Sequence, residues 1–293
     1  MRPTHTAATV DNYAGVLGKW VHPHWKLKNI QEITKTDVHN IVFVEHVGIT
    51  SHTKGNILKM TKRILQMACE EDIISRNPCM GISVKHNEVE QKVLSTQEVE
   101  KFLREAKSVS HRFYPVWVAA LMTGMRSGEL FALGWSDVDF NTKLIRVNKA
   151  WCSKVGITST KTRKNRVVPI SEDLLLFLKA LKLETGKSGF VLPRLWEWEQ
   201  GHQALITREF CMAAGVTPIK FHDMRATFIT NLLSKGVSLA RVMAIVGHSE
   251  IKTTNGYLRR AGVDLKGSTE ELGYKLPAES EGKILQLSSV WKG

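Results

Sequence analysis

The chain has 293 residues, 43% of them hydrophobic and 24% charged, which is enough for one large domain or two ordinary domains with real cores. Its 41 lysines and arginines outnumber 28 acidic residues, and the resulting charge of +13 favours a polyanionic partner such as nucleic acid or an anionic surface. The sequence has no apolar run of about 18 residues and no apolar centre of an export signal near its start, so it excludes a membrane-spanning protein and we expect a cytoplasmic one.

The cysteines and histidines give little sign of a metal site. The cysteines are widely scattered without ligand-like spacing, and we expect buried, reduced thiols at Cys69, Cys79, Cys152 and Cys211. His22 and His24 flank a proline, and such a pair alone is weak evidence for a metal. We therefore expect no structural zinc.

The first part of the sequence predicts helices. Apolar residues recur at helical spacing in residues 6–21, 34–47 and 50–74. Thr34 precedes Asp37 by three residues, which resembles a capping box with Asp in place of Glu or Gln. Asn77-Pro78 then marks a helix boundary.

A polar segment, residues 83–94, reads as a linker between two domains. Ser95 and Glu98 form a full capping box at the start of the next helix. We expect a helical domain over residues 1–88, a second domain over 89–273 and a C-terminal tail over 274–293. Within the tail, residues 283–291 are apolar enough to dock on a neighbouring copy or to fold back on their own domain.

The second part predicts helices around a small β insertion. Residues 143–151 and 165–170 are rich in β-branched residues and read as strands, and the Lys/Thr/Ser-rich segment 152–164 reads as the turn region between them. Helices are predicted at 95–106, 111–125, 126–135, 171–184, 204–215, 221–236 and 238–247. The expected fold is mainly α with a small β-sheet, an α+β class.

Several side chains of this second part could surround a phosphate. Arg126 follows a glycine turn and opens a helix, where free N–H groups also favour an anion, and Glu129 lies on the same face. Taken alone, Arg126 is typical of a solvated charge at a helix start, and Glu129 could equally be an ordinary charge of the first helical turn. His222 and Arg225 are three residues apart on one helix face, where the arginine could hold two phosphate oxygens.

The remaining candidates are a lysine, a histidine and a tyrosine. Lys161 lies in the basic turn region, and Lys164 is close enough to be the alternative. His248 follows a glycine, and Tyr257 comes nine residues later. Read in isolation, each of these residues could be a solvated or structural side chain.

Taken in order, these residues resemble the tyrosine recombinase (phage integrase) family. Members carry an arginine, a β-hairpin lysine, a His-x-x-Arg, a further His or Trp and a nucleophilic tyrosine in this order, and the nine-residue spacing from His248 to Tyr257 also agrees. The motifs span about residues 95–260, and the general pattern reaches back over 6–88. The sequence departs from the family at neighbours of the motif residues, with Ala226 in place of a second histidine.

The resemblance implies a role for each residue. Arg126 and Arg225 would clamp the scissile phosphate, and Lys161 would protonate the leaving 5′-hydroxyl. The remaining implied roles are proton transfer to or from the tyrosine for His222, phosphate stabilisation for His248, nucleophilic attack for Tyr257 and a supporting contact for Glu129.

The resemblance also implies the activity and the partners. The protein would be a site-specific recombinase, an integrase of a phage or another mobile element, that cuts and rejoins DNA through a 3′-phosphotyrosyl bond without metal or cofactor. The N-terminal domain would be the core-binding domain. Expected partners are double-stranded DNA at attachment sites, three further copies in a tetramer on DNA, and accessory DNA-bending or directionality proteins. The alternatives are a type IB topoisomerase-like enzyme and a DNA-binding protein without catalysis.

Overall fold

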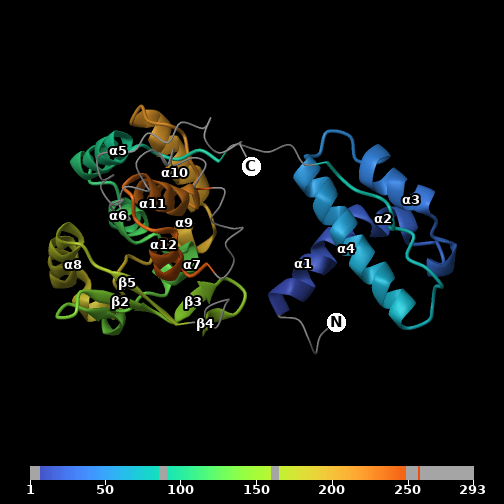
Figure 1. The fold of residues 1–293 in the computed structure, drawn as a ribbon, viewed down its shortest axis with the longest axis horizontal. Coiled ribbons are helices and arrows are strands. Elements are labelled where there is room, and N and C mark those ends of the chain that lie inside the picture. The colour runs from blue at the N-terminus through green and yellow to red at the C-terminus, as the bar shows by residue number, and fades with distance from the viewer. Residues whose placement is uncertain (1–6, 86–90, 160–164, 249–256, 258–293) are drawn as a thin grey trace, which may run out of the picture. The chain divides into compact units, whose positions relative to one another are not determined.

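The computed structural model describes residues 7–85, 91–159, 165–248 and 257 (Figure 1). The chain divides into two compact units, the first comprising Met1–Gln91 with Ser153–Gly156 and the second Lys92–Cys152 with Ile157–Gly293. In the part of the chain that is described, no helix combines the length and apolar character needed to cross a membrane.

The first unit is a small helical bundle. Its helices are α1 (Ala7–Trp20), α2 (His22–Trp25), α3 (Lys35–His39) and α4 (Ser51–Glu70), with a 3-10 turn at Ile30–Glu32. They enclose a core of its own that includes Val38, Val42 and Ile57. The predicted capping box is confirmed: Thr34 accepts from the Asp37 amide, and the Asp37 carboxylate accepts from the Thr34 amide.

Two details of the first unit differ from the sequence prediction. The helix expected over 34–47 is α-helical only to His39 and continues as a π-helix over Asn40–Val44. Residues His22–Trp25, in which the sequence shows only a weak metal motif, form a short helix. Pro23 lies near its N-terminus, where proline costs little.

The second unit packs helices around a buried central helix. The helices are α5 (Thr96–Ser108), α6 (Tyr114–Thr123), α7 (Ser127–Phe131), α8 (Glu172–Thr185), α9 (Trp196–Glu199), α10 (Gln203–Ala213), α11 (Asp223–Ser234) and α12 (Leu239–Val246). Most residues of α6 are buried in the main core, and α11 packs against α6 while α12 packs against the sheet (Figure 1). This packing brings together the ends of α6, α11 and α12.

The β structure is richer than the sequence predicts. Strands β1 (Val138–Asp139), β2 (Leu144–Val147) and β5 (Arg166–Pro169) form an antiparallel sheet in the order β1-β2-β5, with Val147 opposite Arg166. Strands β3 (Lys149–Cys152) and β4 (Gly156–Ser159) form a separate pair. The prediction that residues 152–164 form a turn region is therefore wrong at β4. The glycine and serine of this strand are typical turn residues, so its sequence does not indicate a strand.

The fold class is confirmed as mainly α with small antiparallel sheets. Helix α9 has only four residues, too few for a periodic apolar pattern to predict it. The cysteines are free, as expected, but burial holds only for Cys79 and Cys211, whereas Cys69 and Cys152 are half-buried. The C-terminal tail over 274–293 lies outside the described residues.

Candidate active site

Arg126 lies where α6 turns into α7. The turn begins at Gly124, whose backbone is left-handed (φ +62°) and whose position would place an added Cβ 2.3 Å from the Phe228 ring. Arg126 is the residue before α7, and its side chain is 34% exposed. It donates from Nη1 to Glu129 Oε1 at 3.0 Å, which leaves the rest of its guanidinium for another partner.

Glu129 is the buried acidic centre of the site. Its side chain is 2% exposed, and its carboxylate accepts from the backbone amide of Arg126 at 2.8 Å as well as from the Arg126 side chain. Arg166 completes the set with a bidentate contact, from Nη1 at 2.9 Å and from Nη2 at 2.6 Å. Burial alone would raise the pKa of Glu129, but the hydrogen bonds and charge of Arg166, followed by those of Arg126, hold it below its ordinary value.

Arg225 lies in the first turn of α11 and is 4% exposed. Its Nη1 donates to the carbonyl of Gly124 at 2.6 Å and its Nη2 to the carbonyl of Val246 at 2.5 Å. The arginine therefore fastens α11 to the end of α6 and to the end of α12. These bonds occupy two of the five N–H groups that a guanidinium carries.

The two histidines lie at the ends of α11 and α12, and Tyr257 lies beside one of them. His222 precedes α11, and His248 follows the left-handed Gly247 that ends α12. The rings of His248 and Tyr257 are nearly parallel, at 21°, with their centroids 6.4 Å apart. Tyr257 also packs against an apolar cluster that includes Val242 and Val246.

The charges of these groups act on one another. Burial, followed by the charge of Arg126, lowers the pKa of Arg225 to about 9, while Glu129 and Tyr257 act to raise it. Arg225 therefore stays charged at neutral pH. The charges of Tyr257 and Arg126 both shift the pKa of Arg225, so these three residues belong to one electrostatic cluster.

The two imidazoles are biased towards their neutral forms. Burial, followed by the charges of Arg225 and Arg126, lowers the pKa of His248 to about 4. His222 has an exposed surface, but the surrounding protein atoms and the charge of Arg225 still lower its pKa. A neutral imidazole can donate one hydrogen bond and accept another, so these groups can take part in proton transfer at neutral pH.

This bias predicts a pH dependence of stability. The folded protein holds the pKa of His248 at about 4 against 6.5 in an unfolded chain, so the unfolded state binds more protons between these values. We expect the free energy of unfolding of the second unit to fall as pH is lowered from about 6.5 to about 4, and the fall to be shallower in His248→Gln. Calorimetry across this range measures it, with exposed His202→Gln as the control for losing an imidazole. Equal slopes in wild type and His248→Gln would contradict the assignment.

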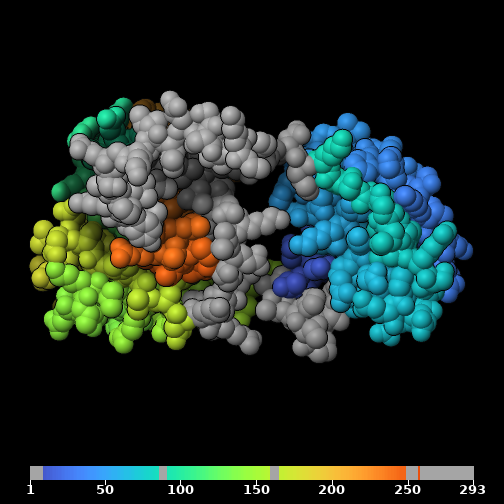
Figure 2. Space-filling view, in the orientation of Figure 1, coloured from blue at the N-terminus to red at the C-terminus, as the bar shows by residue number. Residues whose placement is uncertain are grey.

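The sequence-predicted residues are therefore brought together wherever the structure describes them. Arg126, Glu129, Arg225, His248 and Tyr257 share one region, and the charges of Arg225 and Arg126 also reach His222. Lys161 and its alternative Lys164 lie outside the described residues. From the side drawn in Figure 2, α12 (orange) reaches the surface beside the yellow-green strands.

Arg166 is the residue that sequence reasoning missed. It lies among three other basic residues of the segment 161–166, and no spacing rule separates it from them. The available signal is its position at the start of a strand with alternating burial, which directs its side chain inwards.

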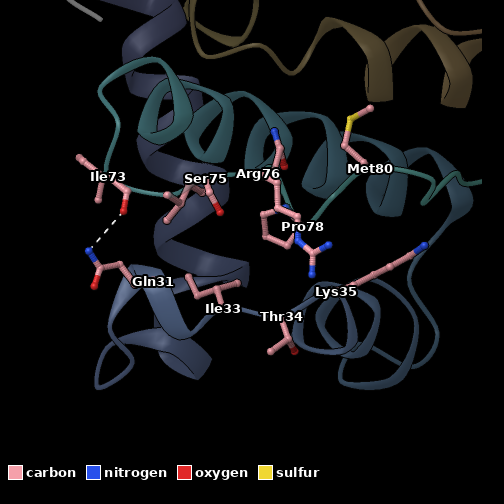
Figure 3. A pocket seen from close by; sticks show the side chains of 11 residues that line it. Gln31, Ile33, Thr34, Lys35, Ile73, Ser75, Arg76, Pro78 and Met80 are labelled. Carbon is pink, nitrogen blue, oxygen red and sulfur yellow. Dashed lines mark hydrogen bonds between the residues drawn. The ribbon is translucent and has the colours of Figure 1, made fainter.

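A cavity lies in the first unit. This cavity of about 640 Å³ is lined by residues between 31 and 35 and between 73 and 80, and Gln31 Nε2 donates to the Ile73 carbonyl at 3.3 Å (Figure 3). Lys35 and Arg76 line it, so it is positively charged. None of the candidate site residues lines it, and the candidate chemistry belongs to the second unit.

Comparison with known proteins identifies the relatives of this chain. The profile described as "Phage integrase family" matches residues 92–262, which contain every candidate residue. The ICEBs1 integrase of Bacillus subtilis (strain 168) is 25% identical over 263 residues, covering 83% of this chain and 71% of that protein. Several other curated relatives are named tyrosine recombinases.

Solved structures share the fold. The Tn1549 transposon integrase in complex with transposon right end DNA has a TM-score of 0.77 at 19% identity, covering 93% of this chain and 95% of that one. A lambda integrase tetramer bound to a Holliday junction has a TM-score of 0.67 at 17% identity, covering 90% of this chain and 75% of that one. The match of the family profile over more than half of the sequence confirms the resemblance seen in the motifs, and the chain belongs to the phage integrase family of site-specific tyrosine recombinases, enzymes that cleave and rejoin DNA strands.

Proposed function

We propose that Tyr257 is the nucleophile of this recombinase and that the arginine cluster activates its target. The observation that carries the proposal is that Tyr257 stacks beside His248 and lies close enough to Arg225 to act on its charge. A free tyrosine has a pKa of about 10 and is a poor nucleophile at neutral pH. A neutral histidine can accept its proton as the oxygen attacks.

In the cleavage step, the Tyr257 oxygen attacks the scissile phosphorus and the bond from phosphorus to the 5′-oxygen breaks. The phenolic proton passes to His222 or to water, and the leaving 5′-oxygen receives a proton from Lys161, or from Lys164 in the alternative assignment. Arg126 and Arg225 neutralise the charge that spreads over the non-bridging oxygens, and His248 donates a hydrogen bond there. Attack by a 5′-hydroxyl of another strand reverses the step, so the bond energy is retained.

The support for this division of roles is exposure and charge. Arg126 keeps most of its donors available and is partly exposed, as a residue that meets the phosphate of a large substrate must be. Arg225 stays charged in its buried position and keeps three N–H groups beyond its two carbonyl contacts. Glu129 aligns Arg126 and takes no part in the proton transfers.

We further propose double-stranded DNA as the partner, bound at attachment sites of a phage or another mobile element. The formal charge of +13 suits such a polyanion, and phosphate contacts by both units would make binding sensitive to salt. We place residues 1–88 as the core-binding domain, 89–273 as the catalytic domain and 274–293 as a tail that docks on a neighbouring copy. Four copies would act on two duplexes in the cytoplasm, with accessory DNA-bending or directionality proteins.

A trapping experiment tests the proposal. The probe is a pool of nicked suicide duplexes with a randomised centre, in which the short 5′-hydroxyl fragment diffuses away after cleavage. We expect a denaturation-resistant adduct whose tryptic peptide carries the nucleotide on Tyr257, and a strong preference for one sequence among the trapped duplexes.

The alternatives give different results. A type IB topoisomerase-like enzyme would trap sequences with little preference and would relax supercoiled DNA without partner strands. A binding-only protein would retard the duplexes and form no adduct. An adduct on another residue would overturn the assignment of Tyr257 and leave the family membership intact.

A further inference from the structure

Arg166 is the most completely engaged arginine of the site. Its side chain is 7% exposed, and three of its N–H groups contact the protein: Nη1 and Nη2 contact the Glu129 carboxylate, and Nε contacts the carbonyl of Ile245 at 2.9 Å. Arg126, in contrast, is 34% exposed and gives Glu129 a single side-chain bond. Arg166 is therefore built to hold protein groups, while Arg126 is free to meet a phosphate.

The contacts of Arg166 join three parts of the site that are far apart in sequence. Its carboxylate partner Glu129 also holds Arg126, so the two arginines share one anchor. Its carbonyl partner Ile245 is near the end of α12, beside Val246, whose carbonyl holds Arg225. The last turn of α12 thus has two neighbouring carbonyls satisfied by two different arginines, which stand in for the bonds that a helix end lacks.

The turn before His248 packs against the aliphatic part of the Arg166 side chain. Gly247 is left-handed (φ +70°), and a Cβ there would lie 2.8 Å from the Cδ of Arg166. Arg166 is also the first residue of β5, paired with Val147 of β2, so its own backbone is fixed by the sheet. A rigid strand thereby sets the position of the turn before His248.

We propose, on the basis of the function proposed above, that Arg166 is a positioning residue that holds Arg126, Arg225 and His248 in register on the scissile phosphate. Arg166 does not touch the reacting atoms. Its bidentate hold on Glu129 and its bond to the end of α12 align the groups that neutralise the phosphate. Lysine cannot reproduce this, because a single ammonium lacks the planar fork that matches a carboxylate.

The test compares Arg166→Lys and Arg166→Met with wild type on three versions of one trapped duplex. The first carries the natural phosphodiester. The second carries a methylphosphonate, which has no charge at the scissile group for the arginines to neutralise. The third carries sulfur at the 5′-bridging position, a leaving group that needs no proton. Arg146→Lys is the matched control, since Arg146 is exposed on the neighbouring strand and contacts only the Ser136 carbonyl in the described contacts.

We expect each Arg166 variant to cleave the phosphodiester and the 5′-thio duplex roughly a hundredfold more slowly than wild type, the loss typical of one preorganised donor. On the methylphosphonate the loss should shrink to a few fold. The ratio of the rates on the natural and neutral duplexes is measured within one preparation, so a partly unfolded variant does not change it.

Two outcomes would overturn the proposal. Equal losses on the phosphodiester and the methylphosphonate would make Arg166 a merely structural residue. If the variants regained the wild-type cleavage rate only on the 5′-thio duplex, Arg166 would act through the group that protonates the leaving 5′-oxygen and not through Arg126 and Arg225. If wild type itself forms no adduct, the proposed function fails, which is a different result from either.

Discussion

Tyr257→Phe is expected to abolish the covalent adduct while leaving DNA binding unchanged. The substitution removes only the hydroxyl, and the ring keeps its stacking on His248 and its packing against the apolar cluster near α12. Without a nucleophilic oxygen no phosphotyrosyl bond can form, and loss of a nucleophile costs roughly 10⁴-fold or more in rate. Single-turnover trapping on the suicide duplex, with a gel shift on the same DNA, measures both effects.

The matched control is Tyr114→Phe, which removes a hydroxyl from the same unit. Tyr114 opens α6 and packs edge-on against Phe177, and it takes no part in the site. It should cleave at the wild-type rate. If Tyr257→Phe still forms the adduct, or if both variants lose activity alike, Tyr257 is not the nucleophile.

The helical elements and the family could be predicted because they depend on local signals. Apolar periodicity gave the longer helices, and the capping pairs Thr34–Asp37 and Ser95–Glu98 formed as expected because side-chain to backbone bonds within four residues need no tertiary information. The motif order identified the family even though each residue alone was ambiguous.

The support of the site could not be predicted, because it depends on contacts between distant residues. The sequence predicts that Glu129 orients Arg126, three residues away, but the bidentate partner of Glu129 is Arg166, 37 residues away. The hold of Arg225 on the Gly124 carbonyl spans 101 residues. Neither contact has a sequence pattern, since a carbonyl acceptor is present at every residue and a buried strand arginine looks like a basic loop residue.

Glu129→Gln is expected to weaken both the fold and the cleavage step. The isosteric amide removes the negative charge that lies among Arg126, Arg166 and Arg225, and it replaces one acceptor oxygen by a donor that faces guanidinium groups. Breaking a buried pair costs about 3–5 kcal/mol, and the melting temperature of the second unit should fall by roughly 10 °C. Misplacement of Arg126 should slow cleavage by roughly a hundredfold or more.

Glu172→Gln is the matched control, because it shows how much stability and cleavage rate are lost when a carboxylate outside the site is removed. Glu172 pairs with Lys143 on the surface with its side chain 73% exposed, and such pairs contribute about 0–1 kcal/mol. The pH dependence gives a second check, because the folded protein lowers the pKa of Glu129 below its ordinary value of 4.5. The stabilisation is therefore present above about pH 4.5 and is lost as the pH falls through the folded-state pKa, so the calorimetric gap between wild type and Glu129→Gln should close in acid. A gap that persists unchanged in acid, or a loss no larger than that of Glu172→Gln, would mean that the buried carboxylate does not anchor the arginines.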